Sequence, residues 1–267
     1  MSRTVDDSCW LPNRSDGTSV VTPVDRPEDP SGEDRADEDQ PDREWWPLDR
    51  RDAVIMLATF IGLTACFTVI GWAIVRWWDP SSFGNADMDV NRWLSDARTA
   101  SRNDLAHFGS MLSGTETMVV MATLLLPVSW LLFRRLHEWA LVAFGLLLEV
   151  TIFVASSTLV GRDRPPVEQL EGAPTSSWPS GHIAAAVVFY GGIALIVIWH
   201  VRRSGPRGVA VGMLMTVPVV VIASRLYLGM HHPSDAAGGI VLGVLCLVIM
   251  GRLVRNQELR LHRASEA

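Results

Sequence analysis

Six long apolar runs, separated by polar stretches, constrain the fold of this chain more than any other feature. A helix needs about 20 mainly apolar residues to cross the hydrocarbon core of a bilayer. The runs that approach or reach this length are Ala53–Val75, Thr117–Phe133, Trp139–Val160, Ile183–Trp199, Val209–Ala223 and Ala236–Val254. The fifth is short and can extend to Tyr227. The predicted fold class is therefore all-α: an integral membrane bundle of six transmembrane helices.

The first 44 residues have the opposite character. They carry 13 Asp and Glu against 5 Arg, a net charge of −8 within a total of −6, so the rest of the chain is slightly basic. Such a segment buries too little apolar surface to offset the entropy of ordering. We expect residues 1–44 to be a disordered acidic cytoplasmic tail, with a docking segment for a partner as the alternative. Residues 45–255 then form a six-span domain, and residues 256–267 form a cytoplasmic C-terminal tail.

Arginine determines the expected orientation, because cytoplasmic loops of membrane proteins are enriched in positive charge. With the N-terminus inside, the inner segments hold the larger share of the arginines near the span ends. The outer segments hold Arg76, Arg92, Arg98, Arg102, Arg162, Arg164 and Arg225. We therefore predict a multi-pass protein of the cell membrane with both termini cytoplasmic. Trp45 and Trp46 would anchor the start of the first span at the interface.

The longest outer loop, Asp79–Glu116, contains a second pattern. Val90, Trp93, Leu94 and Ala97 recur at helical spacing among charged residues, which predicts a short amphipathic helix lying at the membrane interface. It would be a structural lid or spacer, or it would help to admit a lipid.

Small residues mark one face of the sixth span. Gly239 and Gly243 form a small-xxx-small pair, which favours close packing between helices. A homodimer interface is the alternative.

Three short motifs hold the candidate chemistry. They are Gly161–Pro165 (GRDRP), Pro179–His182 (PSGH) and Ser224–Asp235 (SRLYLGMHHPSD). In the predicted topology the first follows the third span, the second precedes the fourth, and the third joins the fifth to the sixth. All three thus fall on the outer face of the membrane, which supports a shared site.

Phosphoryl transfer needs a nucleophile, charge stabilisation on the phosphate oxygens and a proton for the leaving group. His231 is the candidate nucleophile, with Asp235 orienting its ring through the second nitrogen. His182 is the candidate general acid, which later activates water. The neighbouring His232 lacks an Asp at the same spacing, so we do not expect it to be catalytic.

The same motifs supply candidate phosphate-binding groups. Ser180 and Gly181 stand where a helix begins, and a helix N-terminus presents free N–H groups to an anion. Arg164 and Arg225 add planar guanidinium donors. A metal held by the motif histidines and Asp235 is an alternative, but two arginines beside them suit an anion better. We predict no metal and no cofactor.

The second and third motifs resemble those of the type 2 phosphatidic acid phosphatase superfamily, and the resemblance covers roughly residues 50–255. It implies a metal-independent phosphatase that acts on a lipid phosphate or diphosphate through a phosphohistidine on His231 at the outer membrane face. Phosphatidic acid, phosphatidylglycerol phosphate and polyprenyl diphosphate are the implied substrates. The expected partners are this lipid substrate and membrane lipids, not nucleic acid.

One residue departs from the family pattern. The family has a Lys seven residues before the Arg-Pro pair, where this chain has Ser157, and the chain contains no Lys at all. We expect Arg162 to bind phosphate in its place, while Asp163 would either partly neutralise the site or hold an arginine in place. A phosphotransferase with an acceptor other than water, and a catalytically weak scaffold or transporter of the same fold, remain alternatives.

Overall fold

The computed structural model describes residues 50–266, apart from 134–135 and 173–174. The chain divides into two compact units, Met1–Arg43 and Glu44–Ala267, and all described residues lie in the second. The predicted acidic tail and the anchor at Trp45 and Trp46 lie outside the described residues.

The described chain is helical and contains no strand between its first and last described residue, leaving the gaps aside. Its elements are α1 (Arg50–Ala73) with the π-helical turn η1 (Ile74–Trp78), α2 (Ser82–Asp96), α3 (Ala100–Met111), α4 (Thr115–Phe133), α5 (His137–Val160), α6 (Gly181–His200), α7 (Ser204–Tyr227) and α8 (Pro233–Glu266). Six of these helices are long and apolar enough to cross a membrane, and they contain the six predicted runs. The fold-class prediction is confirmed, and the fifth span does reach Tyr227.

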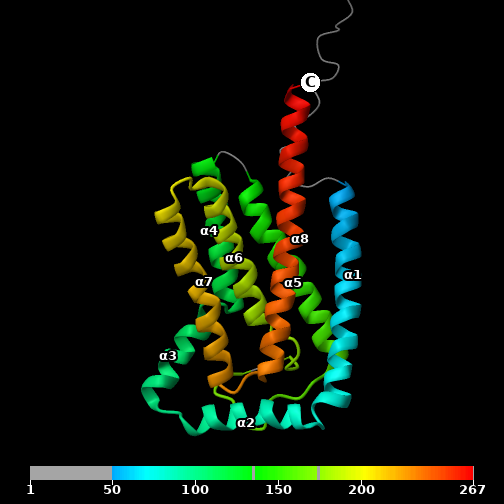
Figure 1. The fold of residues 1–267 in the computed structure, drawn as a ribbon, viewed down its shortest axis with the longest axis vertical. Coiled ribbons are helices and arrows are strands. Elements are labelled where there is room, and N and C mark those ends of the chain that lie inside the picture. The colour runs from blue at the N-terminus through cyan, green and yellow to red at the C-terminus, as the bar shows by residue number, and fades with distance from the viewer. Residues whose placement is uncertain (1–49, 134–135, 173–174, 267) are drawn as a thin grey trace, which may run out of the picture. The chain divides into compact units, whose positions relative to one another are not determined.

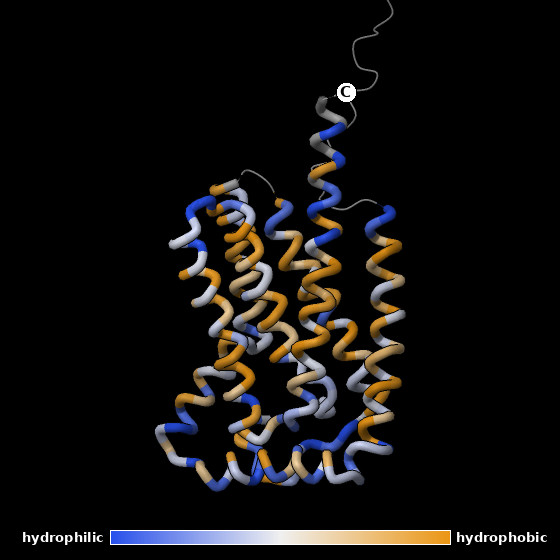
Figure 2. Tube along the Cα trace, viewed as in Figure 1, coloured by the Kyte–Doolittle hydropathy of each residue, from blue (hydrophilic) through white to orange (hydrophobic). Residues whose placement is uncertain are grey.

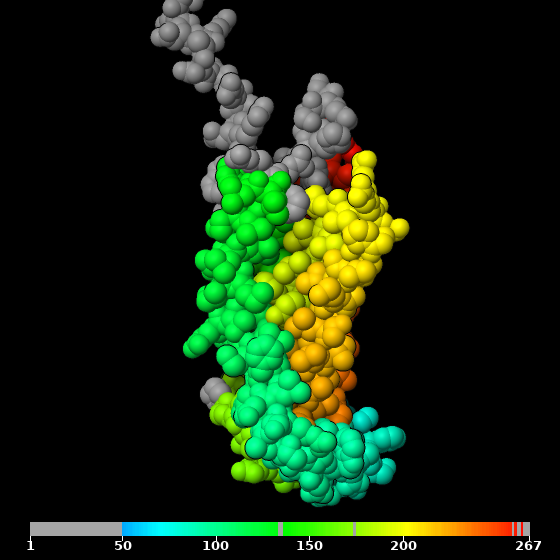
Figure 3. All heavy atoms as spheres, turned by 90° about the vertical axis from the view of Figure 1, so that its left-hand side faces the viewer, coloured from blue at the N-terminus to red at the C-terminus, as the bar shows by residue number. Residues whose placement is uncertain are grey.

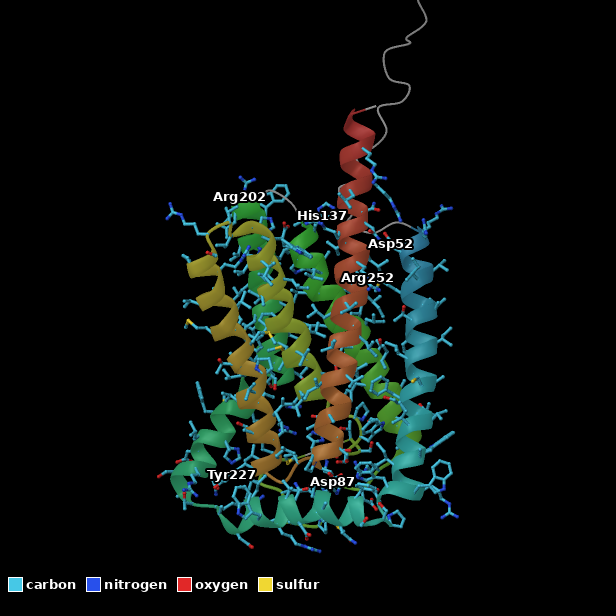
Figure 4. All side chains as sticks on the ribbon, in the orientation of Figure 1. Asp52, Asp87, His137, Arg202, Tyr227 and Arg252 are labelled. Atoms are coloured by element: carbon cyan, nitrogen blue, oxygen red, sulfur yellow. The ribbon has the colours of Figure 1, made fainter. Side chains whose placement is uncertain are left out.

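The six spans run side by side, and α2 lies across one end of them (Figure 1). Apolar residues fill the middle of the spans, while polar residues gather at the two ends (Figure 2). His137 and Arg202 lie at one end, and Asp87 and Tyr227 lie at the other (Figure 4). The most buried span is α6, which packs against α5, α7 and α8. It forms the centre on which the site is built.

The glycine pair of the sixth span packs inside the chain. A Cβ on Gly239 would lie 2.5 Å from the carbonyl oxygen of Ser180, and one on Gly243 would lie 2.7 Å from that of Ala184. The backbones of α8 and α6 therefore approach too closely for any larger residue. The prediction of close helix packing is confirmed, and the homodimer stays a prediction.

The outer loop contains two helices, where the sequence predicted one. The amphipathic helix is α2, but its buried face is polar: Asp87 and Asn91 are buried, while Phe83 and Trp93 are 62% and 69% exposed. Hydrogen bonds account for this inversion, because Asn91 Nδ2 donates to the carbonyl of His231 at 2.9 Å. The second helix, α3, packs against α7 through Gly109 (Figure 3).

The last helix is longer than the sixth predicted span. It continues through the expected C-terminal tail to Glu266. No Gly or Pro occurs between Arg252 and Glu266, so the sequence there contains no strong helix breaker.

Candidate active site

Local turns bring the three motifs to the same end of the bundle. Gly161 ends α5 in the left-handed conformation, with φ of 64°, which a residue with a Cβ adopts at a cost. Gly229 turns the chain after α7 in the same way, with φ of 73°. Pro233 then opens α8, a position that suits its fixed φ and missing N–H. The site predicted at one membrane face is thus assembled from the ends of four helices and the loops between them.

A cavity of about 590 Å³ begins at this end and runs into the bundle. Its polar head is lined by Arg164, Gly181, His182, Arg225 and His231. Its walls are mostly apolar residues of α4 and α5, from Phe153 near the head down to Trp139. These two residues are separated by about 21 Å along α5, at 1.5 Å per residue. The cavity therefore combines a cationic head with a long apolar channel.

The ring of His231 is held by the backbone. Its Nδ1 lies 2.8 Å from the carbonyl oxygen of Ser177. A carbonyl only accepts, so Nδ1 carries the proton and Nε2 keeps its lone pair. Burial, together with the nearby Arg225 guanidinium, holds the pKa of His231 well below its ordinary value of 6.5. His231 is thus neutral at pH 7 and can act as a nucleophile through Nε2.

The position of Asp235 differs from the expectation that it directly orients His231. Its Oδ2 accepts from Ser177 Oγ and, at 2.8 Å, from the backbone N–H of His232. The carboxylate therefore holds Ser177, whose carbonyl binds His231, and it also holds the backbone of His232, the residue after His231. Asp235 acts on the nucleophile through Ser177.

His232 has an acidic neighbour after all. Its Nδ1 lies 3.2 Å from Asp235 Oδ2, three residues ahead, where the sequence argument considered only a spacing of four. His232 is not among the residues that line the cavity. It remains outside the candidate chemistry because of its position, not because it lacks a carboxylate partner.

The two arginines of the cavity head each keep an unsatisfied donor. Arg164 donates to the carbonyls of Met230 and Thr175, and Arg225 donates to Ser110 Oγ at 2.9 Å and to Glu171. The Nε of each arginine is buried without a hydrogen-bond partner among the described residues. Burial, with the positive charge of Arg225 nearby, lowers the pKa of Arg164 to about 10. An anion at the head would satisfy both donors and relieve this repulsion.

Glu171 anchors Arg225 from the loop between α5 and α6. Its carboxylate also accepts from Ser110 Oγ at 3.0 Å and lies 3.1 Å from His107 Nδ1. Burial alone would raise the pKa of Glu171, but Arg225 and these hydrogen bonds together lower it below its ordinary value of 4.5. This role of Glu171 was not predictable, because nothing in the loop sequence identifies which acid meets Arg225.

Arg162 does not replace the missing lysine, which corrects the expectation for this residue. Its guanidinium is buried and pairs with Asp79, Asp87 and Asp235. Nη1 also donates to Ser234 Oγ at 2.8 Å, and Arg162 does not line the cavity. Burial alone would lower the pKa of Arg162, but Asp235 and Asp79 raise it above its ordinary value. Its positive charge is thus already balanced by carboxylates.

The PSGH motif contributes unequally to the cavity. Gly181 and His182 line it, whereas Ser180 is fully buried, lies outside the lining and has no partner for its Oγ among the described residues. A Cβ on Gly181 would lie 2.9 Å from the ring of Phe153. The glycine therefore makes room for a side chain of α5, and its contact with the phosphate stays a prediction.

The sequence argument missed Glu149, which lines the apolar part of the cavity. A signal was available, because an ionisable residue inside a membrane span is costly and often functional. Ser157, the residue in place of the lysine, is buried and is not part of the lining.

The segment that contains these site residues also matches a known protein family. Residues 138–258 match the family model described as the PAP2 superfamily. These residues belong to the PAP2 superfamily. The matched segment runs from α5 to α8 and contains all three motifs.

Curated relatives and a solved structure extend this result. YbjG of Escherichia coli, provisionally named an undecaprenyl-diphosphatase, is 33% identical over 140 residues, which cover 49% of this chain and just under two thirds (66%) of that protein. The decaprenylphosphoryl-5-phosphoribose phosphatase of Mycobacterium tuberculosis is 29% identical over 150 residues, which cover 54% of this chain and 73% of that protein. The crystal structure of a transmembrane PAP2 type phosphatidylglycerolphosphate phosphatase from Bacillus subtilis superposes with a TM-score of 0.65 at 20% identity, covering 74% of this chain and 96% of that one. The last comparison shows a shared fold, that of a multi-pass bundle of transmembrane helices.

Proposed function

We propose that this PAP2 protein is a membrane phosphatase that hydrolyses a lipid phosphate or diphosphate through a phosphohistidine on His231. One observation carries the proposal: two arginines with unsatisfied donors and two histidines meet at the head of an apolar cavity. The head suits a phosphate, and the channel suits the hydrocarbon chain attached to it. Burying such a chain contributes about 0.8 kcal/mol per CH₂ group.

The reaction begins with attack by His231 Nε2 on phosphorus. A P–N bond forms while the bond from phosphorus to the leaving oxygen breaks, and Arg164 and Arg225 stabilise the charge on the equatorial oxygens. An anionic phosphate bound at the head favours the protonated form of His182, which then gives its proton to the departing oxygen, so that the lipid leaves as an alcohol or as a monophosphate.

The second half reverses the roles. Neutral His182 takes a proton from water, the water oxygen attacks phosphorus, and the P–N bond breaks. The products are inorganic phosphate and neutral His231. Throughout both steps the proton stays on Nδ1 of His231, which donates it in a hydrogen bond to the Ser177 carbonyl oxygen. Nε2 is therefore the reacting atom in both steps.

The distribution of arginine supports an extracytoplasmic site. The end opposite the site holds Arg202 and Arg203 between α6 and α7, Arg207 in the first turn of α7, and Arg252 and Arg255 on α8. Most arginines at the site end have partners within the protein; Arg98, for example, donates to the carbonyls of Tyr227 and Glu168. By the positive-inside rule, the site then faces the extracytoplasmic side and both termini face the cytoplasm.

Phosphate release tests the function. The purified full chain, in detergent with EDTA, is given phosphatidic acid, phosphatidylglycerol phosphate and undecaprenyl diphosphate in separate assays. We expect release from at least one lipid, inhibition by vanadate, and no release by the matched variant His231→Ala. Activity that disappears in EDTA and returns with a divalent ion would count against the mechanism, because it assigns all charge stabilisation to arginines and N–H groups.

A further inference from the structure

Glu149 is an acidic side chain inside the apolar part of the cavity. It lies on α5, is 2% exposed and lines the cavity wall. Its Oε1 is buried with no hydrogen-bond partner among the described residues. An unsatisfied buried carboxyl oxygen costs about 1–3 kcal/mol or more, so its presence here needs an explanation.

The depth of Glu149 can be determined from its neighbours on α5. The ring of Phe153, one turn later, lies 2.9 Å from the position that a Cβ of Gly181 would take, so Phe153 lies level with the cavity head. Glu149 is four residues earlier, about 6 Å deeper along the helix axis. Ala185, one turn into α6, lines the cavity as well. The carboxyl group therefore faces the part of a substrate that follows directly after the scissile phosphate.

The described residues give Glu149 Oε1 no hydrogen bond, and Cys246, which interacts with this carboxyl group electrostatically, is only a weak donor. Leu146, Val150 and Ala185 share the lining near it, and the cationic residues of the lining, Arg164 and Arg225, belong to the head. A carboxyl group accepts from a hydroxyl in either protonation state and, when protonated, also donates to an ester carbonyl. Its natural partner in this position is thus an oxygen of the substrate itself.

We propose that Glu149 is a specificity-determining residue that binds a hydroxyl or ester oxygen on the first unit below the scissile phosphate. The preferred substrate class is then a phosphate monoester on a polyol unit, glycerol or sugar, that carries the lipid chain. A polyprenyl diphosphate would place there its second phosphate, which only a protonated carboxyl group can bind, or its hydrocarbon chain, which binds neither form. This inference rests on the proposed function, and the named relatives include both substrate classes.

The test compares two substrates on three proteins. Wild type, Glu149→Gln and Glu149→Leu are assayed as purified full chains for kcat/KM on phosphatidylglycerol phosphate and on undecaprenyl diphosphate. We expect Glu149→Leu to lower kcat/KM for the glycerol lipid about tenfold or more, as for a lost hydrogen bond, and to leave the value for the diphosphate unchanged or raised. Glu149→Gln, which keeps hydrogen-bonding capacity, should stay within about threefold of wild type on the glycerol lipid.

Controls separate the possible failures. Leu146→Met, also in the cavity wall, should leave the ratio of the two kcat/KM values unchanged, and thermal unfolding in detergent checks that each variant folds. If Glu149→Leu lowers both values by the same factor or changes neither, the specificity role is refuted. If Glu149→Leu does not fold, the proposal is judged on Glu149→Gln, and a tenfold loss by that variant on both substrates would refute it. Wild type that releases phosphate from no lipid would instead refute the proposed function.

Discussion

Replacement of Arg162 by Ala tests whether this residue organises the site or binds substrate. Its guanidinium is 1% exposed, and its partner carboxylates on Asp87 and Asp235 are 8% and 0% exposed. Asp79 is more exposed, at 35%, and we discount its contribution because solvent screens it. Removing one partner from a buried ion pair costs about 3–5 kcal/mol, because the remaining charge stays buried without compensation.

For a chain of this size, each kcal/mol lowers Tm by roughly 2–4 °C. We therefore expect Arg162→Ala to lower the Tm of the purified protein in detergent by about 10 °C. Well below the new Tm, kcat should fall, because Asp235 loses an anchor and holds Ser177 less firmly. KM should stay within about threefold of wild type, because Arg162 lies outside the cavity lining.

The matched control is Arg76→Ala, which removes one positive charge from an exposed residue and should leave Tm within about 1 °C. Arg162→Lys should give an intermediate Tm, since it keeps the charge but loses the planar fork. An Arg162→Ala protein with unchanged Tm and a tenfold higher KM would refute the structural role and return Arg162 to the phosphate site.

Three further predictions test the nucleophile, the half-buried acid Glu171 and the topology. His231→Ala should abolish turnover while His232→Ala stays within about tenfold of wild type, since Asp235 keeps its Ser177 contact; the reverse pattern of rates would overturn the assignment. Glu171→Gln should lower Tm at pH 7. Because folding lowers the pKa of Glu171, the difference in Tm between variant and wild type should shrink as pH falls below 4.5. A difference in Tm that does not depend on pH would contradict this. In a background without native cysteines, a membrane-impermeant thiol reagent applied to intact cells should label Gln169→Cys but not Ser204→Cys, and the opposite result would move the site to the cytoplasm.

The spans and the convergence of the motifs were predictable because they depend on simple physical constraints. Twenty apolar residues have few alternatives to a membrane helix, and an even number of spans returns the chain to the same side. Once the spans were counted, His182 and His231 had to lie at one end of the bundle. The small-residue face of α8 was predictable for a similar reason, because Gly239 and Gly243 serve close packing wherever the partner helix lies.

The partners of individual polar groups were not predictable, because they depend on tertiary contacts between distant segments. Arg162 and Arg164 differ by two positions in one motif, yet the first pairs with carboxylates from the outer loop and the second lines the cavity. Nothing in the sequence places Asp79 and Asp87 beside one arginine and not the other. The same holds for the Ser177 carbonyl, which takes the place we expected Asp235 to fill.

The charge of the cavity head leads to a last prediction, for Ser157→Lys. With Arg162 neutralised by carboxylates, Arg164 and Arg225 are the cations of the head, and Glu171 offsets part of Arg225. A phosphate monoester, with a charge near −2, is better balanced by two guanidinium groups than a diphosphate, which carries more negative charge. Ser157 is one turn beyond Phe153, near the C-terminal end of α5. A lysine side chain at this position should therefore reach the cavity head from that end of the helix. We expect Ser157→Lys to raise kcat/KM for undecaprenyl diphosphate by about tenfold relative to phosphatidylglycerol phosphate, as for one added charge-assisted contact. The control is Ser157→Met, whose side chain has a similar length but no charge. If Ser157→Lys changed kcat/KM by the same factor for both substrates, the charge argument would be refuted.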